Sequence, residues 1–150
     1  MSEPTLFEAV GGADGVLRLA AAWHERVMRD DVVSHAFSHG FHPRHTERLA
    51  AYWGEAWGGP PDYTEKYGTE SGVVRMHSGN GIHEDMDQRA IRCFELALED
   101  VGLREPRLRE ALNAYFVWTT TTTMAAYPER GSTVPDHLPL PKWSWSGLQG

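Results

Sequence analysis

With 150 residues, 41% of them hydrophobic, the chain can bury one sizeable core but is too short for two domains to be expected. Its formal net charge of −7 repels nucleic acid and anionic membrane surfaces, so neither is an expected partner. The single cysteine, Cys93, excludes an internal disulfide, and no apolar run approaches the roughly 20 residues that cross a bilayer. We therefore expect a cytoplasmic protein.

Hydrophobic periodicity predicts helices in most of the chain. The first should be capped by Asp14 and end at the Asp30-Asp31 pair, with its apolar stripe formed by Val16, Leu19, Ala20, Trp23 and Val27. The second should hold Pro43 in its first turn and stop at WGGPPDY, because glycines followed by two prolines cannot continue a helix. From there to Val73, about fifteen residues lack a clear period, which predicts a loop that borders a ligand.

Two more helices are predicted in the second half of the chain. One runs from about Glu84 to Val101 and is ended by Gly102. The other begins near Pro106 and extends to Ala126, and the threonine hydroxyls within it can bond to carbonyls one turn back.

The last twenty residues are rich in proline but carry too many apolar side chains for a free tail. They show no strand pattern, and we expect them to pack against the body. The prediction is an all-α fold, with one helical domain over residues 1–130 and a C-terminal extension over residues 131–150 packed on it.

His77 is the first candidate metal ligand. It follows the apolar pair Val73-Val74 closely and is itself followed by the helix breakers Gly79 and Gly81, so its ring can be held rigidly at the edge of the core. A ligating imidazole is neutral and donates its other N–H to an acceptor, which the carbonyl of Val73 or Val74 can supply. From its position alone, a core-edge histidine bonded to a loop carbonyl is the alternative.

Three stretches occur in the order and spacing of a known family: LFEAVGG, ERLAAYWGEAWGGPPDYTEKYG and RMH. Together they resemble the group 2 truncated haemoglobins from about Leu6 to Ala126; no single motif is specific, but the ordered set is. The resemblance implies that residues 1–130 are a truncated globin domain, a two-over-two helical sandwich around haem b (iron protoporphyrin IX). His77 then matches the proximal iron ligand, and Gly79 and Gly81 let the chain turn sharply after a very short ligand-bearing helix.

The resemblance also implies which side chains surround the haem. The distal side should be formed by His24, Phe37, His45, Leu49 and Ala90, with Phe37 in apolar contact with the porphyrin. Arg48 matches a residue that reaches a haem propionate, although a surface arginine is the alternative, and Tyr63 is placed at the same edge. Further cofactor contacts are predicted at Arg75, Met76 and Phe94.

Two positions depart from the usual pattern of the family. His24 stands where a tyrosine commonly bonds the ligand, and Ala90 stands where a tryptophan supplies an indole N–H. The pocket thus offers one or two imidazoles and the room left by an indole. For His24, burial for packing is an equal alternative, whereas His45 is favoured for the pocket because its helix lies over the iron in this fold.

These features predict reversible binding of dioxygen or another small ligand at pentacoordinate iron, with His45 or His24 donating a hydrogen bond to it. The close alternative is a haem enzyme, peroxidase-like or a nitric oxide dioxygenase with a reductase partner, in which the same histidines transfer protons. A third reading has a distal imidazole closing onto the iron. Both a monomer and a homodimer remain open.

Four histidines within eleven residues offer a different metal site: His35, His39, His42 and His45. His35 and His39 have the four-residue spacing that places both on one helical face. Gly40 and Pro43 interrupt any helix through all four, however, and no HExxH pattern accompanies them. A non-haem metal-binding helical protein is therefore the distant alternative.

Overall fold

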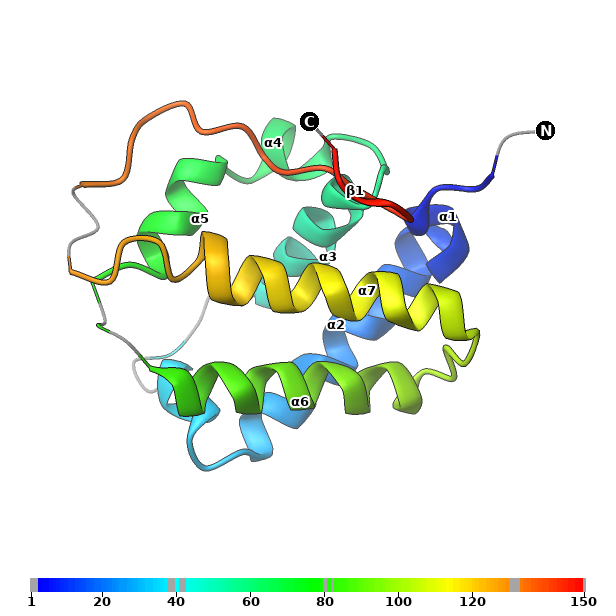
Figure 1. Cartoon of the computed structure of the whole chain (residues 1–150), viewed down its shortest axis with the longest axis horizontal. Coiled ribbons are helices and arrows are strands. Elements are labelled where there is room, and N and C mark those ends of the chain that lie inside the picture. The colour runs from blue at the N-terminus through cyan, green and yellow to red at the C-terminus, as the bar shows by residue number, and fades with distance from the viewer. Residues whose placement is uncertain are drawn as a thin grey trace.

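Helices form most of the computed structural model, which describes residues 3–37, 40, 43–79, 81, 83–129 and 133–149. The predicted all-α class is confirmed. In Figure 1, the long helices α6 and α7 lie side by side in front of α2 and α3. The elements are α1 (Leu6–Val10), α2 (Gly12–Arg29), the 3-10 helix η1 (Val33–Phe37), α3 (His45–Ala56), α4 (Asp62–Lys66), α5 (Glu70–Met76), α6 (Glu84–Asp100), α7 (Pro106–Trp118), the π-helix η2 (Thr119–Thr123), β1 (Trp143–Ser144) and β2 (Gly147–Leu148).

The start of α2 differs from the prediction. Asp14 does not cap the helix but lies in its first turn, because Gly11, with a φ of 116°, both ends α1 and begins α2. A Cβ at Gly15 would meet the carbonyl oxygen of Val10 at 2.2 Å, so this glycine permits the close approach of α1 to α2. The predicted end at Asp30 is confirmed.

The start of α3 is also later than predicted, at His45, so that Pro43 precedes the helix and does not lie in its first turn. Its predicted end is confirmed, since Trp57 is the C-cap and Gly58 follows with a φ of 94°.

The prediction of a loop up to Val73 is wrong, because this segment contains α4 and most of α5. Helices of five and seven residues present at most two turns, too few for a 3.6-residue period to stand out clearly in the sequence. The Thr69 hydroxyl caps α5 by accepting a hydrogen bond from the Gly72 N–H at 3.0 Å. This short helix carries His77 at its C-cap.

The two later helices agree closely with the prediction. Helix α6 spans Glu84–Asp100, and α7 begins at Pro106. The threonine run continues α7 as a π-helix, and the Thr121 hydroxyl donates to the Val117 carbonyl at 2.7 Å, the expected bond one turn back.

Aromatic rings fill the centre of the fold. Phe94 and Phe116 stack with centroids 4.4 Å apart and join α6 to α7, and Trp53 lies edge-on to both. Trp57 and Tyr115 are almost fully buried nearby, with centroids 5.6 Å apart. Among the described residues, no helix is long and apolar enough to span a membrane.

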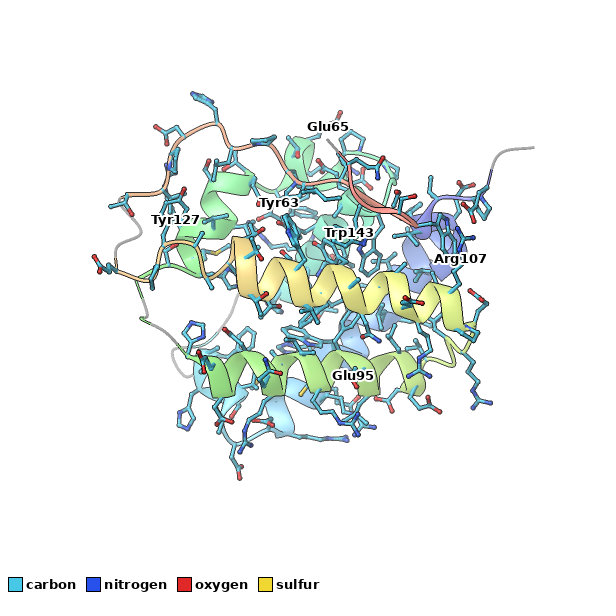
Figure 2. The ribbon with its side chains drawn as sticks, viewed as in Figure 1. Tyr63, Glu65, Glu95, Arg107, Tyr127 and Trp143 are labelled. Atoms are coloured by element: carbon cyan, nitrogen blue, oxygen red, sulfur yellow. The ribbon has the colours of Figure 1, made fainter. Side chains whose placement is uncertain are left out.

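The C-terminal tail follows the side of the molecule formed by α5 and α4 and returns to the N-terminal end of the fold (Figure 1). Its last residues form an antiparallel hairpin of β1 and β2, each two residues long. These strands were not predicted from the sequence. Trp143 of β1 packs its side chain against α7 (Figure 2), where its indole N–H donates to the Ala111 carbonyl at 3.1 Å. Leu140, Trp143 and Trp145 pack against the main core.

Candidate functional site

The imidazole of His77 is fixed by its own helix. Its Nδ1 lies 2.8 Å from the carbonyl oxygen of Val73, one turn earlier in α5. Since that oxygen can only accept, Nδ1 carries the proton, and Nε2 is the nitrogen with the lone pair. The carbonyl partner proposed from the sequence is therefore present.

The side chain of His77 is exposed to solvent, yet the protein packed around it lowers the pKa of its imidazole. Burial lowers the pKa of the imidazole, and the nearby His83 lowers it further, whereas the Val73 carbonyl and Asp87 act in the opposite direction. The net effect favours the neutral ring that a metal ligand requires.

The chain leaves α5 through two glycines in the left-handed region, as the turn predicted after His77 requires. Gly79 has a φ of 80° and Gly81 a φ of 72°. Their N–H groups donate to the carbonyls of Tyr127 and Pro128, at 3.0 and 2.8 Å. The segment after His77 is thus bonded to the chain that follows η2.

Three of the predicted distal residues form one cluster, from three different elements. The rings of His24 on α2 and His45 on α3 have centroids 4.9 Å apart. Phe37 of η1 stands edge-on to both, at 5.4 and 5.0 Å. Burial lowers the pKa of His24, which favours its neutral imidazole. The cluster therefore combines two imidazoles with an apolar wall.

Arg48 makes its contacts with the end of the short helix α4. Its guanidinium donates to the Tyr67 carbonyl at 3.2 Å and lies over the Tyr67 ring at 5.4 Å. Tyr63 is buried beside it, and burial raises the pKa of its hydroxyl although Arg48 opposes the shift. The two residues predicted at one haem edge are thus neighbours.

The other predicted cofactor contacts are dispersed. Leu49 packs on the main core, whereas Phe94 is fully buried within it, so contact of either with a cofactor stays a prediction. Met76 is 68% exposed beside His77, and Arg75 turns outward to form an ion pair with Asp136.

Ala90 lies beside an indole after all, but the indole belongs to Trp23. Its Nε1 donates to the backbone carbonyl of Ala90 at 3.2 Å. Because that N–H is already engaged, Trp23 is no substitute for the indole donor that the family pattern has at position 90.

Comparison with known proteins agrees with this geometry. The family described as bacterial-like globin matches residues 5–124, four-fifths of the chain. The group 1 truncated hemoglobin GlbN of Synechocystis sp. is 31% identical over 108 residues, which cover 71% of this chain and 85% of that protein. The chain is a truncated globin.

Solved structures extend the likeness of this globin to three dimensions. The hemoglobin of Chloroflexus aurantiacus superposes with a TM-score of 0.70 at 25% identity, covering 81% of this chain and 98% of that one. The group II truncated hemoglobin of Bacillus anthracis gives a TM-score of 0.74 at 23% identity, with 85% and 95% covered, and supports the fold. Membership of the family implies haem as the cofactor.

The residues of this globin fit a haem group. His77 presents a neutral, accessible imidazole whose orientation is set by a hydrogen bond, the usual arrangement of a metal-bound histidine. The alternative histidine site stays a prediction, because His39 and His42 lie outside the described residues; within the described part of the chain no group of three His, Cys, Asp or Glu is placed to hold a metal.

Sequence reasoning missed the residues that hold α5. Glu70 is buried and accepts a hydrogen bond from the Tyr52 hydroxyl, and Ser71 is bonded to the tail. The signal was present but faint: with His77, the positions of Glu70, Val73 and Val74 form an i, i+3, i+4, i+7 stripe, the pattern of one helical face.

Proposed function

We propose that this truncated globin binds haem b through Nε2 of His77 and that the five-coordinate iron reversibly binds dioxygen or another small ligand. The observation that supports this most is the hydrogen bond from His77 Nδ1 to the Val73 carbonyl. It sets the tautomer and increases the basicity of Nε2. When bound, haem supplies the iron centre for the ligand.

On the distal side, His45 is the proposed hydrogen-bond donor to the ligand, with His24 beside it. Their ring separation of 4.9 Å supports a shared role. The lowered pKa of His24 favours a neutral imidazole, which can donate one N–H and accept at its other nitrogen. Phe37 supplies the apolar wall against the porphyrin.

Visible absorption spectra of the ferric and the reduced protein, before and after carbon monoxide, test the proposal. We expect a strong Soret band, a five-coordinate ferrous spectrum and its conversion by carbon monoxide. A six-coordinate, low-spin ferrous spectrum would mean that a distal imidazole binds the iron, while a protein that takes up no haemin would refute the proposal and direct attention to the histidine-rich segment.

Proton transfer is the second candidate function, and the His24–His45 pair favours it. With two neighbouring imidazoles, one can accept a proton from a bound peroxide. The other can then stabilise the imidazolium that this forms. The reaction would be peroxidase-like, or a dioxygenation of nitric oxide that requires a reductase. Steady-state turnover with peroxide and a one-electron donor, in the protein and in its His45→Leu variant, distinguishes this activity from simple ligand binding.

A further inference from the structure

The chain beyond the family match returns to the helix that carries His77. The match ends at residue 124, and we call residues 134–138 the strap. In Figure 1 this part of the chain runs along the outer side of α5. Val134 is buried there, so the strap is anchored in the fold.

Ser71 makes the principal connection between α5 and the strap. It is 2% exposed, and its hydroxyl donates to the Pro135 carbonyl at 2.8 Å and accepts from the Leu138 N–H at 3.0 Å. One turn later on the same helical face, Arg75 donates to the Val134 carbonyl at 3.2 Å and pairs with Asp136. The outer face of α5 is therefore bonded to the strap over its whole length.

The opposite face of α5 carries Glu70, Val73 and His77. Glu70 is bonded to Tyr52 of α3, so the helix is held from both sides. Between the strap and α5 is an open groove of about 500 Å³, whose lining includes Ser71, Arg75, Asp136 and Leu138. The strap meets α5 at this groove through the hydrogen bonds of Ser71 and Arg75.

We infer that the strap positions the proximal histidine: by holding the outer face of α5, Ser71 and Asp136 fix the orientation of His77 toward the iron. Ser71 and Asp136 are positioning residues that act through the helix and do not touch the cofactor. Ser71 lies one turn before Arg75, and Val73, between them, supplies the carbonyl that orients the imidazole. A tilt of α5 carries the imidazole with it, so it changes the position and angle of Nε2 relative to the iron and hence the strength of the iron–histidine bond. The inference rests on the proposed role of His77.

Two variants loosen the strap in different ways. Ser71→Ala removes both hydroxyl bonds, and Asp136→Lys places a second positive charge beside Arg75 at a position that is exposed and tolerant of change. The control for Ser71→Ala is Ser144→Ala, because among the described contacts the Ser144 hydroxyl bonds only residues 146 and 149 of the tail. The control for Asp136→Lys is Glu95→Lys, which likewise replaces the acidic partner of a surface arginine, Arg92 on α6, by a lysine.

Three measurements on the haem-loaded full chain test the inference: amide hydrogen exchange in α5, the rate of haem loss to an acceptor globin, and the iron–histidine stretching band in resonance Raman spectra. In Ser71→Ala we expect exchange and haem loss to be faster by about 5- to 30-fold, the range for one or two hydrogen bonds. We also expect the band to move to lower frequency, because an imidazole displaced with α5 binds the iron less strongly. Asp136→Lys should act in the same direction, more weakly.

The outcomes separate the two proposals. If the wild-type protein takes up no haem, the proposed function fails. If it takes up haem but both strap variants keep the wild-type band and exchange rates in α5, the inference is overturned. A lower thermal midpoint with an unmoved band would equally overturn it, because the strap would then stabilise the fold without positioning His77.

Discussion

The hydroxyl of Tyr52 donates a hydrogen bond to the carboxylate of Glu70, and both residues are buried between α3 and α5. Burial raises the pKa of Glu70, although the bond from Tyr52 opposes the shift, and burial raises the pKa of Tyr52 far more. This pair fastens the inner face of α5, as the strap fastens its outer face. The helix that carries His77 is therefore held by polar contacts on both faces.

Replacing Tyr52 by phenylalanine should destabilise the protein by about 1–3 kcal/mol at pH 7, because a buried carboxylate then loses its hydrogen-bond donor. Urea unfolding followed by circular dichroism measures the change. Tyr127→Phe, at a half-buried position on the loop after η2 (Figure 2), is the control and should be nearly neutral. Equal stability of the Tyr52 variant and the wild type would show that the bond contributes nothing.

The stability of the protein should depend on the ionisation of Glu70. Because its pKa in the folded protein is raised above the ordinary 4.5, its stabilising contribution is complete below pH 4.5 and is lost as the pH rises through the folded pKa. Glu70→Gln does not titrate and can still accept from Tyr52. The free energy of unfolding of the wild type should therefore fall relative to that of Glu70→Gln between pH 4 and pH 7. The exposed Glu65→Gln serves as control, and parallel curves for Glu70→Gln and the wild type would contradict the prediction.

Loss of the distal imidazole should speed ligand release. We expect His45→Leu to increase the dioxygen dissociation rate by roughly tenfold, the effect of one hydrogen bond to a bound ligand, and His24→Leu to have the smaller effect. Stopped-flow displacement by carbon monoxide measures both rates. An unchanged dissociation rate together with reduced peroxide turnover would favour the enzymatic alternative, and no change in either would remove His45 from the site.

The tail should contribute to the stability of the whole fold. Trp143 packs against Tyr115 and Trp118, with centroids 5.8 and 5.4 Å away, besides its bond to Ala111. Trp143→Ala should lower the free energy of unfolding by about 2–4 kcal/mol through lost packing. In the same hairpin, Leu148→Ala changes a side chain that is 49% exposed and should cost less than about 0.5 kcal/mol. A similar effect of both substitutions would show that the tail is only loosely attached.

Long periodic helices could be predicted from the sequence, and short polar ones could not. The apolar stripe of α6 and its stop at Gly102 were sufficient to place that helix to within a residue. Helices α4 and α5 were missed because seven residues or fewer contain too little periodicity, although Thr69 is an ordinary N-cap. The start of α2 was misplaced because a glycine, not Asp14, precedes it.

The candidate site could be predicted where a bond is local in sequence. The His77–Val73 contact spans one helical turn, so the position of the histidine limited its expected partner to the carbonyl of Val73 or Val74. The contacts of Ser71 with residues 135 and 138 join segments more than sixty residues apart, and no local pattern predicts them. The distal cluster of His24, Phe37 and His45 followed from the family resemblance, since its members come from three elements.

The measurement that tests the account most directly is the absorption spectrum of haem-loaded His77→Gly, with and without added imidazole. We predict that this variant loses the five-coordinate, histidine-bound ferrous spectrum and that imidazole restores it by occupying the position of the missing ring. His35→Ala, at an exposed position of η1 outside the strap, should keep the wild-type spectrum. A wild-type spectrum for His77→Gly without imidazole would contradict the assignment of His77 as the iron ligand.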